Sequence, residues 1–341
     1  MSAFISIIIP HWNGIDVLSE CLDSLKNSTY QHKEIIIVDN ASSDGSQDWI
    51  KANHPDLILI ENDQNYGYAG GCNRGVSTAK GEWLLFLNND TIQDADWLEH
   101  LADAVGNQND IAAIQPKIRN YYERTLFDYA GGAGGHIDLL CYPFTKGRIF
   151  LDQEEDLGQY DTVEDIFWAS GTAIMVHKES FEKAGKFDET FFAHQEEIDL
   201  CWRLQLMGKR IVYEPKAVVY HKNAVSLPMH SFRKYYLNHR NSFFMLLTNY
   251  NLPLTLYFLP IRLMLEFVAI TYALLKWDLR HFGAVFKSLL WLLTHPFVIL
   301  KKRRIVKRVR VKNDKEMLKN VYRGSIVFAH YIRGIKKYSD L

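Results

Sequence analysis

The sequence predicts an α/β protein built on a mostly parallel central sheet. Three apolar, β-branched runs come early, at residues 5–10, 34–38 and 57–61, and a helix-like stretch separates each run from the next. Strands that alternate with helices in this way pair in parallel. The chain has 341 residues and an apolar content of 48%, enough for one large domain or two modest ones with packed cores.

The elements follow in order along the first two thirds of the chain. Helices are expected at residues 17–25 and 46–52, the second after an Asp-Gly-Ser turn and cap. Further buried strands are expected at 83–87 and 167–176. Between these two strands, the glycines at 131–135 predict a flexible loop.

From about residue 230 the composition becomes strongly apolar and aromatic, at 237–247, 252–275 and 282–300. Charged residues and prolines interrupt these stretches. A spanning helix needs about 20 apolar residues, so none is expected to cross a membrane cleanly. Amphipathic helices lying in a bilayer interface explain the pattern better. The alternatives are a helical hairpin packed on the rest of the chain, or the interface of a homodimer.

Charge is unevenly distributed along a chain whose formal net charge is only −1. Basic residues crowd one short segment near the C-terminus, which predicts contact with an anionic membrane surface. They are Lys301, Lys302, Arg303, Arg304, Lys307, Arg308, Arg310 and Lys312. Because apolar helices adjoin them, we expect lipid and not nucleic acid as the partner, with Trp277 and Trp291 near the headgroups.

The four cysteines are widely spaced and form no Cys-x-x-Cys pair. This pattern predicts neither a disulfide framework nor a structural zinc site, and it fits a reducing cytosol. The chain enters its first strand without a basic region and cleavage site, so no signal peptide is expected.

The segment at residues 194–203 combines three carboxylates and an arginine at the start of an apolar helix pattern. Ionised carboxylates this close repel one another, and an arginine on the same turn partly offsets the repulsion. One of them can thereby serve as a base near neutral pH. The alternative is a solvated helix start with an ordinary pair between Asp199 and Arg203.

Two of the predicted strands are expected to end at or near a carboxylate. The strand at 83–87 runs into Asn88-Asn89-Asp90, and the strand at 34–38 ends at Asp39 before a polar turn. Ligands of open α/β sheets bind at the carboxyl ends of strands, where a carboxylate can accept a hydrogen bond from a base or a ribose. Turn formation explains the residues after Asp39 equally well, but not the aspartate itself.

The glycine-rich segment at 65–75 is interpreted as a loop that permits close backbone approach to a ligand, with Arg74 available to a phosphate. It matches neither the dinucleotide fingerprint nor the P-loop. A dehydrogenase is a poor interpretation for the same reason, since the glycines at 131–135 lack the flanking strand and the downstream acidic residue.

Taken together and in this order, several motifs resemble glycosyltransferase family 2, and within it the rhamnosyltransferase-like branch. They lie at residues 6–13, 39–45, 65–75, 88–90 and 196–203. The resemblance covers roughly the first 230 residues and implies a GT-A fold over 1–230. It divides this domain into a nucleotide-sugar half at 1–115 and an acceptor half at 116–230. Residues 231–341 would follow as a helical, membrane-associated region.

The resemblance also implies residues for the nucleotide-sugar site. Those near the nucleobase, the ribose and the rest of the donor would be Pro10, Trp12, Asn13, Asp39, Asn73, Arg74, Asn88 and Asn89. The motif at 88–90 departs from the fully acidic form, so only Asp90 would bring charge to a Mg²⁺ or Mn²⁺ ion. The family suggests His221 as a later ligand, although a histidine after a strand is often merely structural.

At the acidic motif the family usually reads Glu-Asp-x-Asp, whereas Glu197 is the second member here. The resemblance implies inverting transfer with Glu197 as base, and Glu196 as acceptor-binding partner and first alternative. Asp199 and Arg203 would fix the helix start. The acceptor pocket would be lined by Trp168, Ser170 and Gly171, although Trp168 is equally well explained as a core residue.

These expectations describe a metal-dependent, inverting glycosyltransferase. It would move a sugar, such as rhamnose from dTDP-rhamnose, to a polyprenyl-linked or growing saccharide. The place would be the cytoplasmic face of a bacterial inner membrane, with the protein bound peripherally, and the process cell-surface polysaccharide synthesis. The alternative is a non-catalytic nucleotide-sugar-binding or scaffold protein of the same fold, which the two amides at 88–89 and the Glu-Glu pair would suit.

Overall fold

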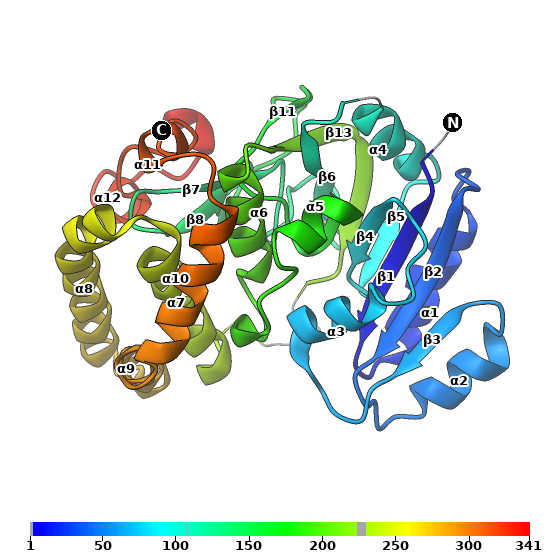
Figure 1. Ribbon diagram of the computed structural model, residues 1–341, viewed down its shortest axis with the longest axis horizontal. Coiled ribbons are helices and arrows are strands. Elements are labelled where there is room, and N and C mark those ends of the chain that lie inside the picture. Colours follow the sequence, from blue (N-terminus) through cyan, green and yellow to red (C-terminus); the bar gives the residue numbers. More distant parts are fainter. Residues whose placement is uncertain (1–2, 107, 224–229) are drawn as a thin grey trace.

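The computed structural model describes residues 3–106, 108–223 and 230–341 and has a large central sheet with a layer of helices beyond one side of it (Figure 1). Within these residues the sheet has nine strands in the order β11-β13-β6-β12-β4-β1-β2-β3, and β5 pairs with β13. The strands are β1 (Ile5–His11), β2 (Lys33–Asp39), β3 (Ile58–Glu61), β4 (Trp83–Leu87), β5 (Thr91–Gln93), β6 (Ile111–Asn120), β11 (Glu164–Asp165), β12 (Ala173–His177) and β13 (Arg210–His221).

The predicted parallel arrangement of the first four strands is confirmed. β1 pairs in parallel with β2 and with β4, and β2 pairs in parallel with β3. Side chains alternate across the sheet, so Ile5, Ile7 and Ile9 face one core while Ile8 faces the other. The helices that pack on the two faces are α1 (Ile15–Lys26), α2 (Ser46–Asn53) and α4 (Trp97–Val105) on the first, and α3 (Gly67–Gly75), α5 (Lys178–Lys183) and α6 (Glu196–Leu206) on the second.

The segment at 65–75 is a helix and not the predicted loop. Its glycines lie where other parts of the chain approach the helix too closely for a side chain. A Cβ atom at Gly75 would lie 2.4 Å from Ile8, one at Gly71 would lie 2.8 Å from Asn40, and one at Gly67 would lie 2.3 Å from the carbonyl oxygen of Phe192. Close packing of α3 on β1, on Asn40 after β2 and on the loop before α6 therefore explains these three glycines.

The strand predicted at 167–176 begins only at Ala173. Residues 167–172 form a connection instead. Trp168 makes an isolated β-bridge with Gly135. The backbone then turns, and the amide of Ala173 donates to the carbonyl of Ser170 at 3.1 Å. Hydrophobicity alone did not distinguish this buried connection from a buried strand.

A small antiparallel sheet stands beside the large one. Its four strands within the described residues are β7 (Gly135–Ile137), β8 (Pro143–Thr145), β9 (Arg148–Ile149) and β10 (Asp152–Gln153). The last short helices are α11 (Asp314–Met317), α12 (Ile326–Tyr331) and η2 (Tyr338–Asp340). A separate apolar cluster, which includes Phe144 and Ile326, joins this sheet to α12.

Four longer helices form the layer beyond α6, seen at the left of Figure 1. They are α7 (Phe232–Asn249), α8 (Leu252–Leu275), α9 (Leu279–Thr294) and α10 (Pro296–Val309). The stretch predicted as one helix at 282–300 is two, because the chain bends by 74° between α9 and α10. Pro296 begins α10, where its missing amide hydrogen is tolerated.

The expectation that charges interrupt every apolar stretch needs one qualification at α8, which by length and composition alone could cross a membrane. Among the described residues, α8 is the one helix that is long and apolar enough to span a membrane. The bent pair of α9 and α10 would be a second such segment if the two helices are counted as one. The two charges inside α8 do not interrupt its outer face. Arg262 and Glu266 are fully buried and pair at 2.7 Å.

The outer side of α8, α9 and the start of α10 exposes many large apolar side chains. We call this surface the apolar helical face. It includes Leu256, Tyr257, Met264, Phe267, Val268, Leu275, Trp277, Phe286, Leu293 and Phe297. Of the neighbouring basic residues, Lys302 does not face outward as predicted, because it is buried and paired with Asp188 and Asp199 at 2.9 and 2.6 Å. Lys301, Arg304, Lys307 and Arg308 remain exposed.

Candidate active site

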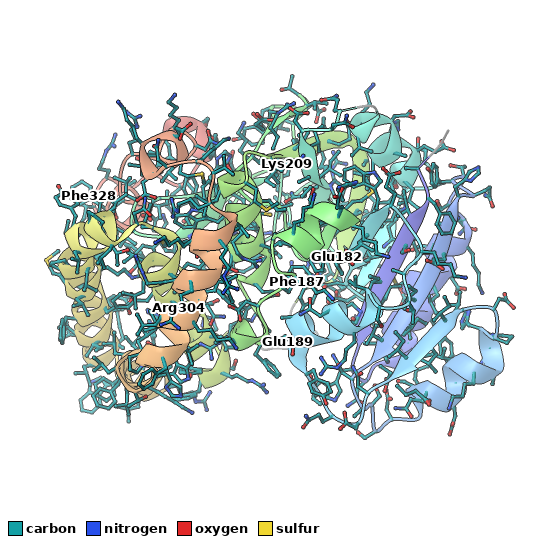
Figure 2. The ribbon with its side chains drawn as sticks, in the orientation of Figure 1. Glu182, Phe187, Glu189, Lys209, Arg304 and Phe328 are labelled. Atoms are coloured by element: carbon teal, nitrogen blue, oxygen red, sulfur yellow. The ribbon has the colours of Figure 1, made fainter. Side chains whose placement is uncertain are left out.

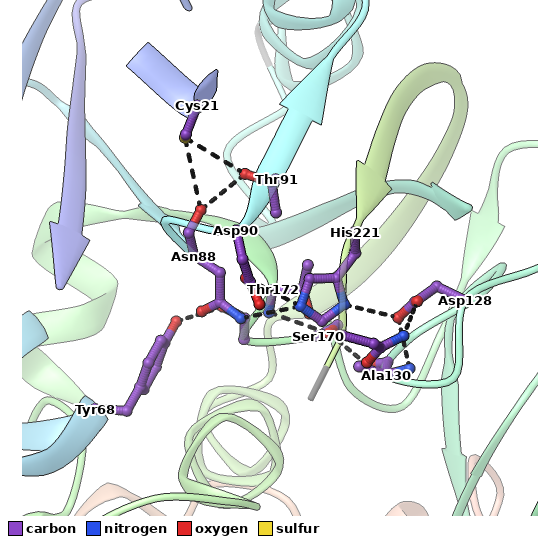
Figure 3. Close-up of polar contacts among 12 residues, drawn as sticks. Cys21, Tyr68, Asn88, Asp90, Thr91, Asp128, Ala130, Ser170, Thr172 and His221 are labelled. Atoms are coloured by element: carbon purple, nitrogen blue, oxygen red, sulfur yellow. Dashed lines mark hydrogen bonds and ion pairs between the residues drawn. The ribbon is translucent and has the colours of Figure 1, made fainter. Parts of the chain in front are cut away.

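The Asn88-Asn89-Asp90 motif lies at the carboxyl end of β4, where the sequence predicted it. The chain then forms β5, which pairs with the end of β13 and sets Thr91 opposite His221. This register brings the two predicted metal ligands together, with Nε2 of His221 3.2 Å from Oδ1 of Asp90 (Figure 3).

Asp128 completes this cluster, and the sequence reasoning missed it. Its Oδ1 lies 3.0 Å from Nδ1 of His221. Burial lowers the pKa of His221, but the carboxylates of Asp90 and Asp128 outweigh it and raise the pKa to about 10. Burial raises the pKa of Asp90, and the ring of His221 more than offsets this, so the pKa is lowered. No motif around Asp128 marks it in the sequence, because only the fold brings it to His221.

The two amides of the motif have different partners. Asn88 lies with Nδ2 3.5 Å from Nε2 of His221, and its backbone amide donates to the carbonyl of Thr172 at 2.9 Å. Asn89 lies with Nδ2 2.8 Å from Nδ1 of His11, whose Nε2 is 2.9 Å from Oγ of Ser46. His11 was also missed, although a buried polar residue at the end of a predicted strand is itself a signal.

The carboxyl end of β2 forms a second polar group with the end of β1. Oδ1 of Asp39 accepts hydrogen bonds from the amide of Ser42 at 2.9 Å and from Nε2 of Gln47 at 2.6 Å. Oδ2 of Asp39 is buried and accepts none within the described residues. Asn13 joins the two strand ends, since its amide donates to Oγ of Ser42 at 2.9 Å and its Oδ1 accepts from the amide of Ser43 at 2.8 Å.

Pro10 and Trp12 flank this group. Trp12 is 48% exposed, so its ring is open to a ligand at the end of β1. Pro10 is partly exposed and lies under α3, where a Cβ atom at Gly71 would be 3.3 Å from it. The predicted nucleobase residues thus share one edge of the sheet.

Asn73 and Arg74 already have protein partners. The side chain of Asn73 donates to the carbonyl of Phe187 at 2.9 Å and accepts from its amide at 3.1 Å. The guanidinium of Arg74 lies 3.3 Å from the centre of the Tyr66 ring, and it is 3.7 Å from Glu189, which Figure 2 labels beside α3. These contacts tie α3 to the segment before α6.

The two glutamates predicted as general base and acceptor-binding partner, Glu197 and Glu196, lie in the first turn of α6. Glu196 is 3% exposed, and its Oε2 has no hydrogen-bond partner among the described residues. Burial raises the pKa of Glu196 well above the usual range, and the charges of Glu197 and Asp199 add to this. Glu197 is partly exposed, and burial raises its pKa to about 7. One carboxyl is therefore held protonated while the other can exchange a proton near neutral pH.

Tyr68 of α3 connects the two carboxylate groups. Its hydroxyl donates to the carbonyl of Gly171 at 2.6 Å, and the charges of Glu196 and Glu197 contribute to its raised pKa, after the larger effect of burial. The next residue, Thr172, accepts from the amide of Asn88. The predicted acceptor segment therefore runs between the Asp90 cluster and the start of α6.

Within that segment the side chains differ in access. Trp168 is buried and donates its indole N–H to the carbonyl of His136 at 2.7 Å, a core position that favours the second interpretation of this residue. Ser170 is buried too, and its Oγ donates to the carbonyl of Ala130 at 2.5 Å. Gly171 is partly exposed.

Asp199 and Arg203 form the predicted pair one turn into α6. Nη2 of Arg203 lies 2.8 Å from Oδ2 of Asp199, and both side chains are buried. Asp199 also accepts from Nδ2 of Asn249 at 3.0 Å and pairs with Lys302. The helix that carries the acidic motif is thus tied to α7 and α10.

Two curated bacterial proteins are similar to this chain. It is 27% identical over 232 residues to the O-antigen biosynthesis protein RfbC of Myxococcus xanthus, covering 65% of this chain and 17% of that protein. It is 27% identical over 219 residues to a poly-beta-1,6-N-acetyl-D-glucosamine synthase of Staphylococcus aureus, covering 63% of this chain and 48% of the synthase. The chain spans about half or less of the length of these relatives.

Two solved structures share the fold. GalNAc-T7, solved with UDP, GalNAc and Mn²⁺, superposes with a TM-score of 0.57 at 17% identity, over 70% of this chain and 47% of its own. The mannosyltransferase PcManGT from Pyrobaculum calidifontis, solved with GDP-Man and Mn²⁺, superposes with a TM-score of 0.52 at 17% identity. That match covers 94% of this chain and 87% of the mannosyltransferase.

The predicted GT-A fold is confirmed by these structures, and the predicted family by the sequence. The model of the family described as Glycosyl transferase family 2 matches residues 6–184, from β1 into α5. That span includes the Asp39 group and the Asp90 motif. The chain therefore belongs to glycosyl transferase family 2, and it is a glycosyltransferase.

Proposed function

We propose that this chain transfers a sugar, with inversion and with the help of a divalent metal ion, from a nucleoside diphosphate donor to a polyprenyl-linked or growing saccharide. The observation that carries the proposal is the presence of two acidic sites with different chemistry. A cluster at the end of β4 suits a cation, and a partly exposed carboxyl on α6 has its pKa raised to about 7. Such a carboxyl favours an enzyme over a non-catalytic relative.

The nucleoside would bind at the carboxyl ends of β1 and β2. Oδ2 of Asp39 is a buried acceptor without a partner in the described chain, which suits the N–H of a pyrimidine base or a ribose hydroxyl. Trp12 offers an exposed ring for stacking. Asn13 orders the turn around Asp39 through its contacts with Ser42 and Ser43.

The metal would bind between Asp90 and His221. Oδ1 of Asp90 is buried and lies 3.2 Å from Nε2 of His221, a separation that suits two ligands of one ion. Without an ion the two form an ion pair, because the carboxylates of Asp90 and Asp128 raise the pKa of His221 to about 10. A bound metal would therefore take the place of the proton on Nε2, while Asp128 at Nδ1 orients the ring. Among the described residues no group of three or more His, Cys, Asp or Glu is arranged to hold a metal, so oxygens of the diphosphate and water would supply the other ligands. When bound, Mg²⁺ or Mn²⁺ would neutralise charge on the departing diphosphate.

Glu197 would act as the base. Its carboxylate takes the proton of the acceptor hydroxyl while that oxygen attacks the anomeric carbon, on the face opposite the diphosphate. The C–O bond to the diphosphate breaks as the new C–O bond forms, so the configuration inverts. Protonated Glu196 beside it would hold the acceptor and keep a second negative charge away from the base.

The donor would be a pyrimidine nucleotide sugar, with dTDP-rhamnose as the first candidate from the resemblance. The acceptor would reach the site at the cytoplasmic face of a bacterial inner membrane during surface polysaccharide assembly. The similarity to an O-antigen biosynthesis protein supports this process, and the apolar helical face with its exposed cations supports membrane contact. The division at residues 230 and 231 remains a prediction.

Incubation of the purified chain with a panel of nucleotide sugars, with Mn²⁺ or with chelator, tests the chemistry through release of nucleoside diphosphate. Turnover of one donor that stops with chelator is expected, and release from no donor would contradict the proposal. Flotation with anionic liposomes at low salt tests membrane contact. The full chain should float, and a Leu293→Glu, Phe297→Glu double variant on the apolar helical face should float less.

A further inference from the structure

The loop that leads into the base-bearing helix has an unfavourable backbone. Phe192, His194 and Gln195 have φ angles of 65°, 68° and 71°, in the left-handed region that side chains other than glycine rarely adopt. Gln195 directly precedes Glu196, so these angles decide where the first turn of α6 points. Such a loop keeps its shape only when surrounding contacts hold it.

Two adjacent residues of α7 donate side-chain hydrogen bonds to the backbone carbonyls of this loop. Nδ2 of Asn241 lies within hydrogen-bond distance of three carbonyl oxygens, at 3.3 Å from Phe191, 3.0 Å from Ala193 and 2.6 Å from His194. Nη2 of Arg240 donates to the carbonyls of Thr190 and Phe191, each at 2.8 Å.

Arg240 also fixes the orientation of Asn241. Its Nε and Nη2 donate to Oδ1 of Asn241 at 2.8 and 2.6 Å, so the amide oxygen faces the guanidinium and the amide nitrogen must face the loop. Asn241 is fully buried and Arg240 is 7% exposed. The requirement is for a donor toward the loop and an acceptor toward the arginine, which among side chains of this size only asparagine provides.

We propose that Arg240 and Asn241 are positioning residues that set the base-bearing turn of α6 against the acceptor. The inference rests on the proposed role of Glu197. It makes the helical layer part of the catalytic apparatus, because α7 determines where Glu197 stands and Lys302 of α10 braces Asp199 one turn later.

Asn241→Ala removes the donors, and Asn241→Asp keeps the contact with Arg240 but presents oxygen to the three carbonyls. Both should lower kcat by about 10- to 100-fold, the loss that a shift of about 1 Å in a catalytic group produces. Nucleotide binding at the ends of β1 and β2, measured by calorimetry, should change by less than about twofold. Ser242→Ala is the matched control. This neighbouring residue is buried and donates to the carbonyl of Cys141 at 2.7 Å, away from the loop.

The pH profile distinguishes positioning from simple loss of folded protein. Glu197 interacts electrostatically with Glu196, Tyr68 and Cys201, since its charge adds to the raised pKa of each. In a loosened loop Glu197 gains water, so the acidic limb of kcat should move to lower pH in the Asn241 variants and stay in place in Ser242→Ala. A merely structural role would lower the melting temperature and leave the limb and kcat per folded molecule unchanged.

Asn241 variants with kcat within twofold of Ser242→Ala and an unmoved acidic limb would overturn the inference. If they do not fold, Arg240→Lys serves instead, since a lysine keeps the charge but cannot bridge the two carbonyls and Oδ1 of Asn241 together. Glu197→Gln separates the two proposals. An active Glu197→Gln enzyme refutes the base assignment, whereas an inactive one beside normal Asn241 and Arg240 variants refutes the positioning role alone.

Discussion

The two acidic sites of this enzyme are built in different ways. Asp39 ends β2, Asp90 comes three residues after β4, and His221 ends β13, so the central sheet places all three. Glu197 stands instead after a strained loop that α7 holds, on a helix braced by α10. The sheet thus fixes one site through backbone pairing, and the helical layer fixes the other through side chains.

The first test of this comparison removes the charged residue of the proposed cation site. Asp90→Ala should lower turnover by at least about a thousandfold, because a metal supplies several kcal/mol of charge stabilisation at a departing diphosphate. Donor binding should at the same time lose its dependence on Mn²⁺, measured by calorimetry. His221→Ala should weaken metal use by less, since Asp90 retains the charge.

Asp96→Ala is the control for this variant, because Asp96 is an exposed carboxylate at the start of α4. It should keep wild-type turnover and wild-type metal dependence. An Asp90→Ala enzyme that turns over at the wild-type rate in excess chelator would show that the metal assignment is wrong.

The second test removes the proposed base, Glu197, and leaves the sheet untouched. Glu197→Gln should lower turnover by roughly two to four powers of ten, since the amide keeps the shape of the side chain but cannot accept a proton. Binding of donor and of metal should remain close to wild type. Glu196→Gln should mainly raise the acceptor KM. The reverse pattern, an active Glu197→Gln beside an inactive Glu196→Gln, would exchange the two roles.

The site at the strand ends could be predicted from the sequence because the patterns that mark it are local. An apolar run that stops at a carboxylate marks both Asp39 and Asp90, and the four parallel strands followed from the same periodicity. Asp128 was missed because it joins His221 only through the fold. His11 was missed because its partners, Ser46 and Asn89, are far from it in the sequence and meet it only in the folded sheet.

Only part of the site on α6 could be predicted from the sequence. The acidic motif gave Glu196 and Glu197, but nothing in the local pattern connects them to Asn241 or to Lys302, which follow much later in the chain. The basic run was interpreted as a lipid-binding surface, and Lys302 within it is instead buried beside Asp199. Tertiary contacts of this kind leave no periodic signal in one sequence.

The third test asks how much of the fold depends on this brace. Lys302→Met removes the cation beside the buried Asp199 and the partly buried Asp188, so the free energy of unfolding should fall by about 3 kcal/mol. The neighbouring Lys301→Met is the control, because Lys301 is exposed and its loss should cost less than about 0.5 kcal/mol. Denaturant titration of both variants measures the difference, and equal stabilities would mean that α10 does not brace α6.

The smallest expected effect concerns the pH dependence of stability. Burial raises the pKa of Glu196 well above its unfolded value near 4.5 and the pKa of Glu197 to about 7. The folded state therefore prefers the protonated acids, and this contribution is complete below about pH 4.5 and lost as the pH rises through the folded-state pKa. Glutamine cannot ionise, so Glu196→Gln should match the wild-type melting temperature at pH 4.5 and exceed it by about 2 °C at pH 8.

The exposed carboxylate of Glu182 on α5 provides the control, labelled in Figure 2. Glu182→Gln should change the melting temperature equally at both pH values, because this side chain is exposed to solvent on α5. The measurement is differential scanning fluorimetry across this range in a single mixed buffer. A Glu196→Gln difference that does not change with pH would mean that the α6 carboxyls are hydrated. The raised pKa that supports Glu197 as the proposed base would then lose its physical cause.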